Sequence, residues 1–540
     1  MLKFILLLVV LTSTITAQTA KSDAEKWRED LAFMAREMEA THKDLFHTMT
    51  RQEFEAAIKK LHAEIPNLQR HQIIVELMKI VAMVEDGHSN VYPTRDAKIA
   101  FHSLPVQLYL FSDGMFIRSA RNEHKELVGA RILKIGPATV DEAIKRISPL
   151  VGRDSEMGLK YFAPYLLAMP EVLHAVGLAN SIESAEFTIE RAGRQETITL
   201  KPSGPVEILP ADTDVSWLPK EGWVDMRDIS KTPLWLRDAK NLFWYEYLPE
   251  SKTVYAQINQ VGNKKDESLA AFAKRLTTFI ETNPVEKLII DLRLNRGGNG
   301  TLLKPLEVAL LKSRIDQPGK LFILMGRSTW SASQFFLNWM EKYSNAVFIG
   351  EPSASRGNVF GDSRRIYLPN SGVTVRVSVY YWQDWMPWDT RLSFSPNVTA
   401  ELSSTDYKTN NDPALTAALR YTPQKSLFAQ LDEALTAGGV ELAVKRFREW
   451  KIDPVNKYAD TETALLEAGQ RLLNEKKPAD ALELFKLDIA DNPHSYRGYY
   501  AAGVAYNESG KKDLAITSLK KALELNPKSY DVANYLRQLR

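Results

Sequence analysis

The first ninety residues carry apolar side chains at helical spacing. Residues 27–38 and 54–61 repeat apolar positions three and four apart, and a longer apolar run covers 73–84. This period places the apolar side chains on one face of an α-helix, and that face is buried only when helices pack together. The pattern therefore predicts a helical N-terminal domain.

Short strand-like segments follow from about residue 100. They include 106–111, 130–135 and a pair of strands within 187–200, and they enclose a helix-like segment at 140–147 and a helical insertion at 159–178. Short runs rich in β-branched and aromatic residues are typical of strands. We therefore expect a small module in which strands and helices are mixed.

Strands and helices then alternate. The predicted strands are 253–258, 288–292, 321–325 and 346–349, and the predicted helices are 267–280, 302–311 and 333–343. Strands that are joined by helices usually lie parallel in one sheet, and the helices cover its faces. The pattern predicts a mainly parallel α/β domain.

A strand pair around a Pro-Asn-Ser-Gly turn is predicted within 366–382. Large aromatic side chains gather at its end, namely Tyr380, Tyr381, Trp382, Trp385 and Trp388. They either form an apolar wall for a substrate or pack in a domain core, and we favour the core.

A repeat of 34 residues marks the C-terminal end of the chain. Ala481, Phe485 and Asn492-Pro493 recur as Ala515, Leu519 and Asn526-Pro527, and a unit that starts at Leu465 has the same phasing. The spacing resembles the tetratricopeptide repeat. Two repeats bury little apolar surface by themselves, so we expect them to lean on the helices predicted within 427–450. A partner peptide in the groove and a docking or dimerisation role both stay open.

Composition narrows the range of functions. The chain has 540 residues, 44% of them hydrophobic, which is enough for three or four domains. Its net charge is +2 and its basic residues are scattered, so nothing indicates a nucleic-acid partner. It has no cysteine, which excludes disulfides, metal thiolates and thiol catalysis. We expect neither a metal nor another cofactor.

The N-terminus has the pattern of a signal peptide. Lys3 precedes a short apolar core that ends near Leu11, and small polar residues lead to Ala17, where we expect cleavage. The apolar core is too short to span a bilayer, and no cysteine follows it that could carry a lipid. An exported protein of the periplasm or the extracellular space is predicted, without a stable membrane anchor after cleavage.

Two short stretches carry the candidate chemistry. The strand predicted at 288–292 runs into Gly297-Gly298, where missing Cβ atoms leave backbone N–H groups accessible. Ser331 and Gln334 have capping-box spacing, which predicts Ser331 at the N-cap of the next helix. The helix dipole and the unpaired N–H groups stabilise negative charge there. The alternative is an ordinary loop and a serine that only caps the helix.

These stretches resemble the tail-specific (C-terminal-processing) and tricorn-core family of serine peptidases. The motifs are Asp291-Leu-Arg-Leu-Asn-Arg-Gly-Gly298, Ser331-Ala-Ser333 and Gly350-Glu-Pro352, and the resemblance covers roughly residues 80 to 420. It implies that Ser331 is the nucleophile, that the N–H groups of Gly298 and Ala332 form the oxyanion hole, and that Gly297 contacts substrate. It also implies that the strand module is PDZ-like; its capture of a peptide and a purely structural role are both open.

The general base departs from the tail-specific pattern. A lysine is expected shortly after Gly-Glu-Pro, but Arg356 stands there, and a guanidinium has no lone pair with which to take a proton. The tricorn-like branch uses a histidine, which implies His88 in Asp86-Gly-His-Ser89. Imidazole titrates near neutral pH, so it can accept a proton from serine and return it. Arg356 is left to bind charge, such as a substrate carboxylate.

A carboxylate is expected to orient the imidazole, as in other triads. The resemblance points to the segment before residue 395, where Asp389 and Asp384 are candidates and Glu401 is a poorer one. Each is by itself more typical of a solvated surface acid. Ser89 is a candidate for an intermediate hydroxyl.

Together these observations predict a multi-domain α/β protein and an exported serine endopeptidase that hydrolyses peptides or proteins through an acyl-enzyme. A non-catalytic scaffold of the cell envelope is the alternative, and an esterase is disfavoured because no Gly-x-Ser-x-Gly surrounds Ser331. The expected parts are a signal peptide (1–17), a helical domain (18–95), a PDZ-like module (96–205), a connecting segment (206–250), a peptidase core (251–422), a helical linker (423–460) and tetratricopeptide repeats (461–540).

Overall fold

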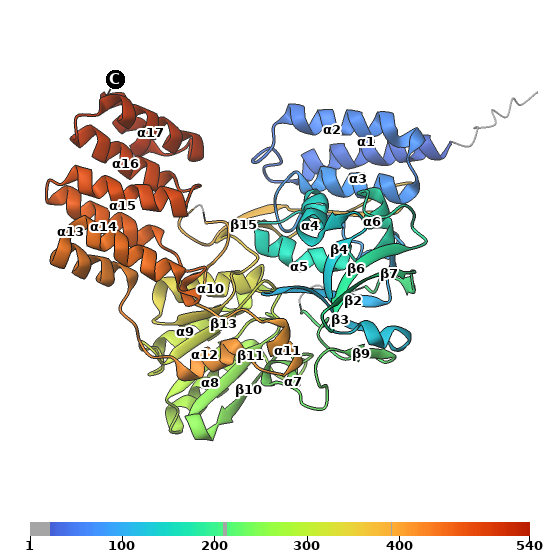
Figure 1. The fold of residues 1–540 in the computed structure, drawn as a ribbon, viewed down its shortest axis with the longest axis horizontal. Helices are drawn as coiled ribbons and strands as arrows, with labels where there is room; N and C mark the ends of the chain where they lie inside the picture. Colours follow the sequence, from blue (N-terminus) through green and yellow to red (C-terminus); the bar gives the residue numbers. More distant parts are fainter. Residues whose placement is uncertain (1–21, 209–212, 390, 540) are drawn as a thin grey trace, which may run out of the picture.

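The computed structural model describes residues 22–208, 213–389 and 391–539 (Figure 1). The predicted signal peptide lies outside this part of the chain. Among the described helices, none has the length and the apolar content that crossing a membrane requires.

The predicted N-terminal helices are α1 (Asp23–Thr41), α2 (Arg51–Glu64) and α3 (Arg70–Ala82). Ser22 with Glu25 and Thr50 with Glu53 form capping boxes that start α1 and α2. Helix α3 is buried along most of its length, as its apolar sequence requires. It ends just before the loop that carries His88.

The predicted strand module is an antiparallel sheet with helices on one side. Its strands β2, β3, β4, β6 and β7 are neighbours in that order, β5 pairs with β4, and β9 pairs with β3. Their bounds are β2 (Val106–Phe111), β3 (Gly114–Arg121), β4 (Arg131–Ile135), β5 (Ala138–Thr139), β6 (Ala185–Arg191), β7 (Arg194–Leu200) and β9 (Trp223–Asp225). The helices are α4 (Val140–Ile147), α5 (Glu156–Leu166) and α6 (Pro170–Ala175). A short pair, β1 (His102–Ser103) with β8 (Gly204–Pro205), joins its ends. This module and the N-terminal helices share one hydrophobic core.

The alternating region forms a six-stranded sheet, in the order β10-β11-β12-β13-β14-β19. All pairs from β11 to β19 are parallel, and only β10 is antiparallel, so the predicted parallel sheet is confirmed. The strands are β10 (Phe243–Leu248), β11 (Thr253–Ile258), β12 (Lys287–Asp291), β13 (Leu321–Met325), β14 (Val347–Gly350) and β19 (Val398–Thr399). Strand β10 falls within the predicted connecting segment, after the short α7 (Leu234–Arg237).

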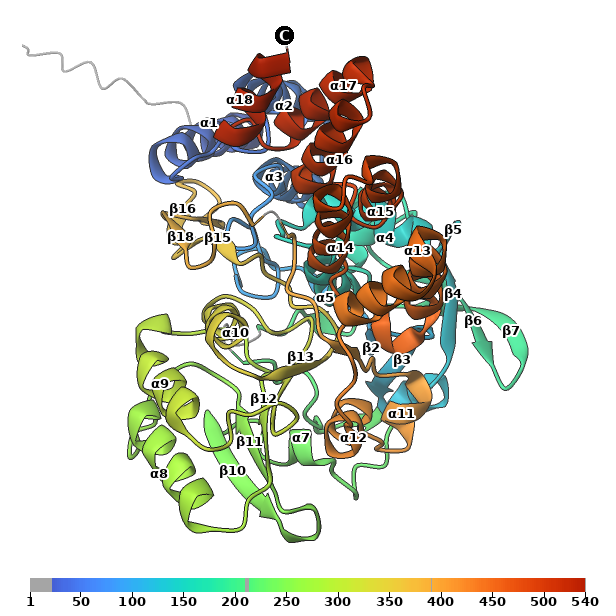
Figure 2. The same cartoon turned by 90° about the vertical axis from the view of Figure 1, so that its left-hand side faces the viewer.

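Helices cover both faces of this sheet (Figure 2). Helices α8 (Leu269–Thr282), α9 (Lys304–Lys312) and α10 (Ala332–Tyr343) share a core with one face. Helix α12 (Pro413–Arg420) packs its alanines on the other face, and α11 (Ser404–Lys408) precedes it. The carboxyl ends of β12 and β13 lead to Gly298 and Ser331, so the parallel order brings the two predicted motifs to one edge.

Two hairpins join this sheet to the N-terminal half. Strand β15 (Asn358–Gly361) pairs with β18 (Tyr380–Gln383), and β16 (Arg364–Tyr367) pairs with β17 (Thr374–Val377) as predicted. The apolar side chains of the β16–β17 hairpin lie in the core of the N-terminal helices. At its turn, the backbone N–H groups of Asn370 and Ser371 each donate to the buried Asp30 carboxylate at 2.8 Å. The hairpin therefore fastens the loop of His88 to the sheet domain.

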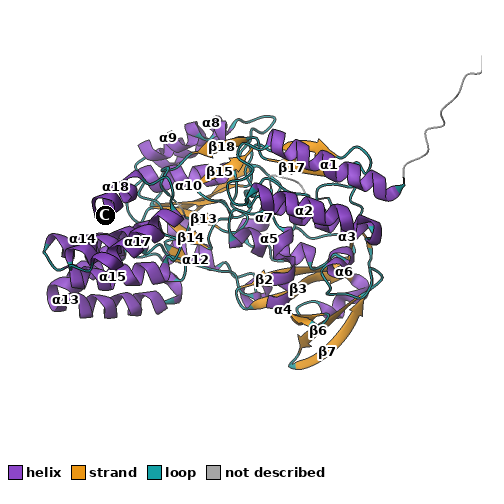
Figure 3. Ribbon diagram, turned by 90° about the horizontal axis from the view of Figure 1, so that it is seen from above, coloured by secondary structure: helices purple, strands orange, loops and turns teal. Residues whose placement is uncertain are grey.

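The C-terminal residues form a stack of helices. They are α13 (Leu427–Ile452), α14 (Glu462–Asn474), α15 (Pro478–Asp491), α16 (Tyr496–Glu508), α17 (Lys512–Leu525) and α18 (Tyr530–Leu539). Helix α13 is kinked at Gly438-Gly439 and shares a core with α14 and α15, which confirms that the repeats lean on this segment. From above, the stack and helices α1 to α3 lie at opposite ends of the molecule (Figure 3).

Candidate active site

Ser331 occupies the N-cap position of α10 but does not cap it. Its backbone has φ +59° and ψ −124°, and its side chain makes no hydrogen bond to the helix. The predicted capping box with Gln334 is therefore wrong: the Gln334 amide donates to Asn338 Oδ1 at 2.9 Å and accepts from Ser353 Oγ at 2.6 Å. A non-glycine residue at positive φ costs about 1–3 kcal/mol. This strain turns the Ser331 hydroxyl away from the helix and leaves it available for reaction.

The Gly297-Gly298 turn lies against Ser331. A Cβ atom on Gly297 would lie 2.8 Å from Ser331 Cβ, and one on Gly298 would lie 2.1 Å from the carbonyl oxygen of Val261. Both glycines also have positive φ, so no other residue allows this close approach. The N–H of Gly297 donates to Asn295 Oδ1 at 2.9 Å, and its carbonyl accepts from Val261 N at 2.8 Å. Gly297 thus shapes the turn, and its polar atoms are occupied within the protein.

The backbone N–H groups of Gly298 and Ala332 flank the Ser331 hydroxyl. Neither donates a hydrogen bond within the described residues. Both residues line the cleft that contains Ser331, and Ala332 is the first residue of α10. Two unpaired donors beside a hydroxyl at the positive end of a helix can hold an oxyanion.

The loop of His88 is built around Asp86. The buried Asp86 Oδ1 accepts from the N–H groups of His88 and Ser89, both at 2.6 Å, and from Ser378 Oγ at 2.9 Å. Its Oδ2 lies 2.9 Å from His42 Nε2. Burial by itself would raise the pKa of Asp86, but the hydrogen bonds from His42 and Ser89 outweigh it and lower the pKa. An ionised, fully bonded carboxylate therefore fixes the backbone of His88.

The structure brings His88 and Ser331 together. His88 Nε2 lies 3.0 Å from Ser331 Oγ, although 243 positions separate the two residues in the chain. The indole ring of Trp330 stacks on the imidazole with 4.1 Å between the ring centroids. Burial lowers the pKa of His88, and the negative charges of Asp154, Asp86 and Asp362 only partly oppose this. The imidazole is consequently neutral at pH 7 and can accept a proton.

The carboxylates expected from the sequence do not contact this imidazole. Asp389 is paired with Arg391 at 2.7 Å, Asp384 accepts from Asn338 Nδ2 at 2.9 Å, and Glu401 is paired with Lys160 at 3.2 Å. Each is therefore already bonded to a partner of its own. Ser89 Oγ accepts from the N–H of Ser378 at 3.0 Å and, within the described chain, makes no hydrogen bond to His88.

Asp154 is the carboxylate that the sequence analysis missed. It is buried just before the start of α5, and its Oδ1 accepts from the N–H of Gly87 at 2.9 Å. Its Oδ2 and His88 Nδ1 are both buried, and each lacks a hydrogen-bond partner within the described residues. Among the charges that act on His88, Asp154 is the one that raises its pKa most. Asp154 stands in Arg153-Asp154-Ser155, a sequence that looks like an ordinary helix start, so no local signal identifies it.

Arg356, at the position of the missing lysine, contacts the Asp154 segment. Its Nε donates to the backbone carbonyl of Asp154 at 3.0 Å. Burial raises the pKa of Asp154. The charge of His88 and, to a smaller extent, that of Arg356 oppose this rise. This hydrogen bond helps to hold the backbone of Asp154 in place.

The cleft around Ser331 has two lobes. One lobe is a cavity of about 540 Å³ whose walls include Phe335, Trp339 and Trp382, and the other is a cavity of about 350 Å³. Trp382 is 41% exposed and Tyr380 is 59% exposed, so the expectation that this aromatic cluster packs in a domain core is wrong. The shared walls of the two lobes are His88, Gly298, Ser331 and Asp362.

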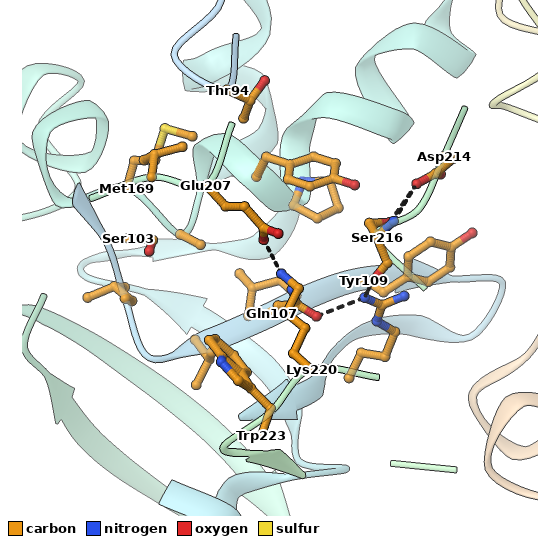
Figure 4. A pocket seen from close by; sticks show the side chains of 18 of the residues that line it. Thr94, Ser103, Gln107, Tyr109, Met169, Glu207, Asp214, Ser216, Lys220 and Trp223 are labelled. Carbon is orange, nitrogen blue, oxygen red and sulfur yellow. Dashed lines mark hydrogen bonds and ion pairs between the residues drawn. The ribbon is translucent and has the colours of Figure 1, made fainter. Parts of the chain in front are cut away.

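A separate cavity of about 530 Å³ lies between the strand module and residues 205–207 and 214–223 (Figure 4). Its walls include Tyr109 of β2, Arg118 of β3 and Tyr165 of α5. Neither Ser331 nor His88 lines it. Across the described residues, no cluster of three or more His, Asp and Glu side chains is placed to hold a metal ion.

Comparisons with known proteins bear on both ends of the chain. Residues 496–529 match a family model described as tetratricopeptide repeat, which confirms the predicted repeat there. No curated protein matches the sequence.

Solved structures show similarity as well. Mature CPAF complexed with lactacystin matches with a TM-score of 0.48 and 12% identity, covering 71% of this chain and 95% of that one. The photosystem II D1 C-terminal processing protease matches with a TM-score of 0.30 and 15% identity, covering 70% and 93%. MamA from Desulfovibrio magneticus RS-1 matches with a TM-score of 0.16 and 24% identity, covering 21% and 62%. A C-terminal processing protease and tetratricopeptide repeats, the two resemblances found in the sequence, are thus both represented among the matches.

Proposed function

We propose that the protein is an exported serine peptidase. The observation that carries this proposal is the 3.0 Å contact between His88 Nε2 and the hydroxyl of a strained Ser331. A neutral imidazole at this distance is a general base for serine. Export is supported by the sequence pattern of residues 1–17 alone, and a partner for the helical stack is supported by its repeats.

The geometry supports two chemical steps. His88 Nε2 takes the proton of Ser331 while Oγ attacks the peptide carbonyl carbon, and the N–H groups of Gly298 and Ala332 hold the oxyanion. The C–N bond then breaks, His88 returns the proton to the leaving amine, and an acyl-enzyme remains. In the second step His88 takes a proton from water, the hydroxide attacks the ester, and Ser331 regains its proton.

Asp154 has the role of a positioning residue in this proposal. The imidazolium that forms during each step carries a positive charge on a buried ring, and a nearby carboxylate lowers its free energy. The unpaired Oδ2 of Asp154 and the unpaired Nδ1 of His88 are the groups available for this interaction.

A fluorophosphonate probe tests the proposal. We expect it to label the purified wild-type chain and to leave Ser331→Ala and His88→Ala unlabelled, because the probe needs an activated hydroxyl. The matched control is Ser344→Ala at the C-terminal end of the same helix, where Oγ donates to the carbonyl of Met340 at 2.6 Å. Labelling should persist in that variant. An unlabelled wild type contradicts the peptidase and favours the peptide-binding scaffold.

A further inference from the structure

We propose that the larger lobe of the cleft binds a positively charged side chain of the substrate, a lysine or an arginine, with Glu307 of α9 as its partner. The enzyme then prefers to cleave a peptide bond that adjoins a basic residue. This inference rests on the proposed peptidase function and specifies its substrate class.

The larger lobe is the cavity of about 540 Å³ whose walls include Ser331. Gly298 and Ala332, whose N–H groups hold the oxyanion in the proposed mechanism, line the same lobe. A side chain that enters this lobe therefore belongs to a residue next to the carbonyl carbon that Ser331 attacks. The walls of the lobe thus select the bond that is cleaved.

Apolar side chains form a large part of the walls of this lobe. They are Leu303 before α9, Phe335 and Trp339 of α10, Val359 of β15 and Trp382 of β18. A chain of methylene groups packs well on such walls, and the faces of aromatic rings attract a cation. The side chains of lysine and arginine combine an apolar stem with a charged tip, so their stems match these walls.

Glu307 places a carboxylate among these apolar walls. It is only 3% exposed, it lines the lobe, and its side chain forms no hydrogen bond or ion pair with another described residue. Burial raises the pKa of Glu307 to about 7; the charge of Lys304 opposes this rise, and the charge of Asp384 adds to it. A buried carboxylate without a partner is unfavourable in its charged form, and a cation that binds beside it removes this penalty.

Two further carboxylates of the lobe have neutral partners. Asp384 Oδ2 accepts from Asn338 Nδ2 at 2.9 Å, and Asp362 Oδ2 accepts from Trp382 Nε1 at 3.1 Å. Neither carboxylate forms an ion pair with a described residue. Because a neutral donor does not cancel a charge, both acids add to the negative potential that a cation meets in this lobe.

Lys304 is the one lysine or arginine among the described residues that line the lobe. Its Nζ lies 3.0 Å from the centroid of the Trp339 ring and forms no ion pair with Glu307. An ammonium group therefore already packs on an aromatic wall of this lobe, and the carboxylate of Glu307 is left for a second cation.

Matched peptides test this inference. An internally quenched octapeptide carries a single arginine between small neutral residues, and its counterpart carries citrulline, which has nearly the same shape and no charge. At about pH 8 we expect kcat/KM for the arginine peptide to exceed that for the citrulline peptide by about tenfold or more, because a charge-assisted hydrogen bond is lost with citrulline. Mass spectrometry of the products should place the cleaved bond next to the arginine.

The pH dependence of this ratio identifies the carboxylate. The titratable groups on the walls of the lobe are Glu307, Asp384, Asp362, Lys304 and His88. Protonation of Glu307 removes its charge, so the ratio should fall as the pH decreases through about 7. Protonation of His88 slows both peptides alike and cancels in the ratio. A ratio that is constant between about pH 6 and pH 8 contradicts the role of Glu307.

Variants locate the effect. Glu307→Gln should reduce the arginine-to-citrulline ratio to near one and remove its change around pH 7. Lys304→Met should raise the ratio, because it removes a competing positive charge from the lobe, and should move the midpoint to higher pH, since the charge of Lys304 lowers the pKa of Glu307. Lys312→Met is the matched control, since it removes the same charge from the last turn of the same helix, outside the lobe, and should leave the ratio unchanged.

A wild-type ratio near one overturns the inference, and so does a ratio that survives in Glu307→Gln. The exposed position of Lys304 provides the test if Glu307→Gln does not fold: an unchanged ratio in Lys304→Met then overturns the inference.

Binding to Ser331→Ala separates this inference from the peptidase proposal. Fluorescence anisotropy with the same labelled peptides measures affinity without hydrolysis. If no peptide is cleaved and no probe reacts, the peptidase proposal fails, while tighter binding of the arginine peptide still supports the cation site. If peptides are cleaved but the arginine and citrulline peptides bind equally and are cleaved equally, only the cation site fails.

Discussion

The smaller lobe of the cleft and the separate cavity of Figure 4 are both lined by arginines, but only the lobe borders Ser331. In the cavity of Figure 4, Arg118 donates to Gln107 at 2.9 Å and stacks on Trp217 at 4.6 Å, and Lys220 is paired with Glu207. The Nε and Nη1 atoms of Arg118 have no hydrogen-bond partner among the described residues. In the lobe, Arg95, Arg296 and Arg376 line the same cavity as Ser331 and His88.

The larger of these two cavities is lined by neither Ser331 nor His88. The cavity of Figure 4 has about 530 Å³ and the lobe about 350 Å³, but of the two only the lobe borders the Ser331 hydroxyl, the His88 imidazole and Gly298. The positions of unused polar groups therefore indicate function better than volume does.

The substitution of His88 is expected to have the largest effect on catalysis. We expect His88→Ala to lower kcat by at least about 10³-fold, because proton transfer from Ser331 is lost. In the wild type, kcat/KM should be constant near neutral pH and should fall as the pH decreases through a midpoint below 6.5, since burial lowers the pKa of His88 from 6.5 and only the neutral ring accepts a proton. A pH profile of peptide hydrolysis measures this. A midpoint above 6.5 contradicts the role of the buried ring.

A smaller effect is expected from Asp154. We expect Asp154→Asn to lower kcat by about 10²-fold with little change in KM, because the variant lacks the negative charge that raises the pKa of His88 most and stabilises the buried imidazolium. The pH midpoint should also move to lower pH, since the charge of Asp154 raises the pKa of His88. The control is Asp389→Asn, which alters the acid predicted from the sequence and should stay within about threefold of the wild type. Equal losses in both variants would remove Asp154 from the mechanism.

The smallest effect is expected at the mouth of the cavity in Figure 4. Lys220→Gln removes a partly exposed ion pair with Glu207, and such pairs contribute about 0–1 kcal/mol to stability. We expect kcat/KM within about twofold of the wild type and a melting temperature lower by a few degrees at most. Thermal unfolding and peptide hydrolysis measure the two quantities. A tenfold loss of kcat/KM would show that this cavity communicates with Ser331.

Local patterns in the sequence were sufficient for the framework of the site. The alternation of strand and helix periods predicted the parallel sheet, and a parallel sheet places the segments after β12 and β13 at one edge. Gly298 and Ser331 follow those two strands directly in the chain. His88 was predicted from the resemblance, and the structure places it 3.0 Å from Ser331.

Other parts of the site depend on contacts between distant segments. Asp154 lies in a loop with no period or motif, and only the folded chain sets it beside His88. The capping box failed because the Ser331 backbone adopts a positive φ that its sequence spacing does not encode. The aromatic side chains of β18 were assigned to a core because hydrophobicity does not distinguish a core from the wall of an open cleft.

The β16–β17 hairpin links two bodies that fold around different cores, one with His88 and one with Ser331. Along the chain His88 comes first, Ser331 follows 243 residues later, and the hairpin of β16 and β17 is made after both. If the chain is the proposed peptidase, we therefore expect it to cut peptides only after this hairpin has been made and has docked on the N-terminal helices.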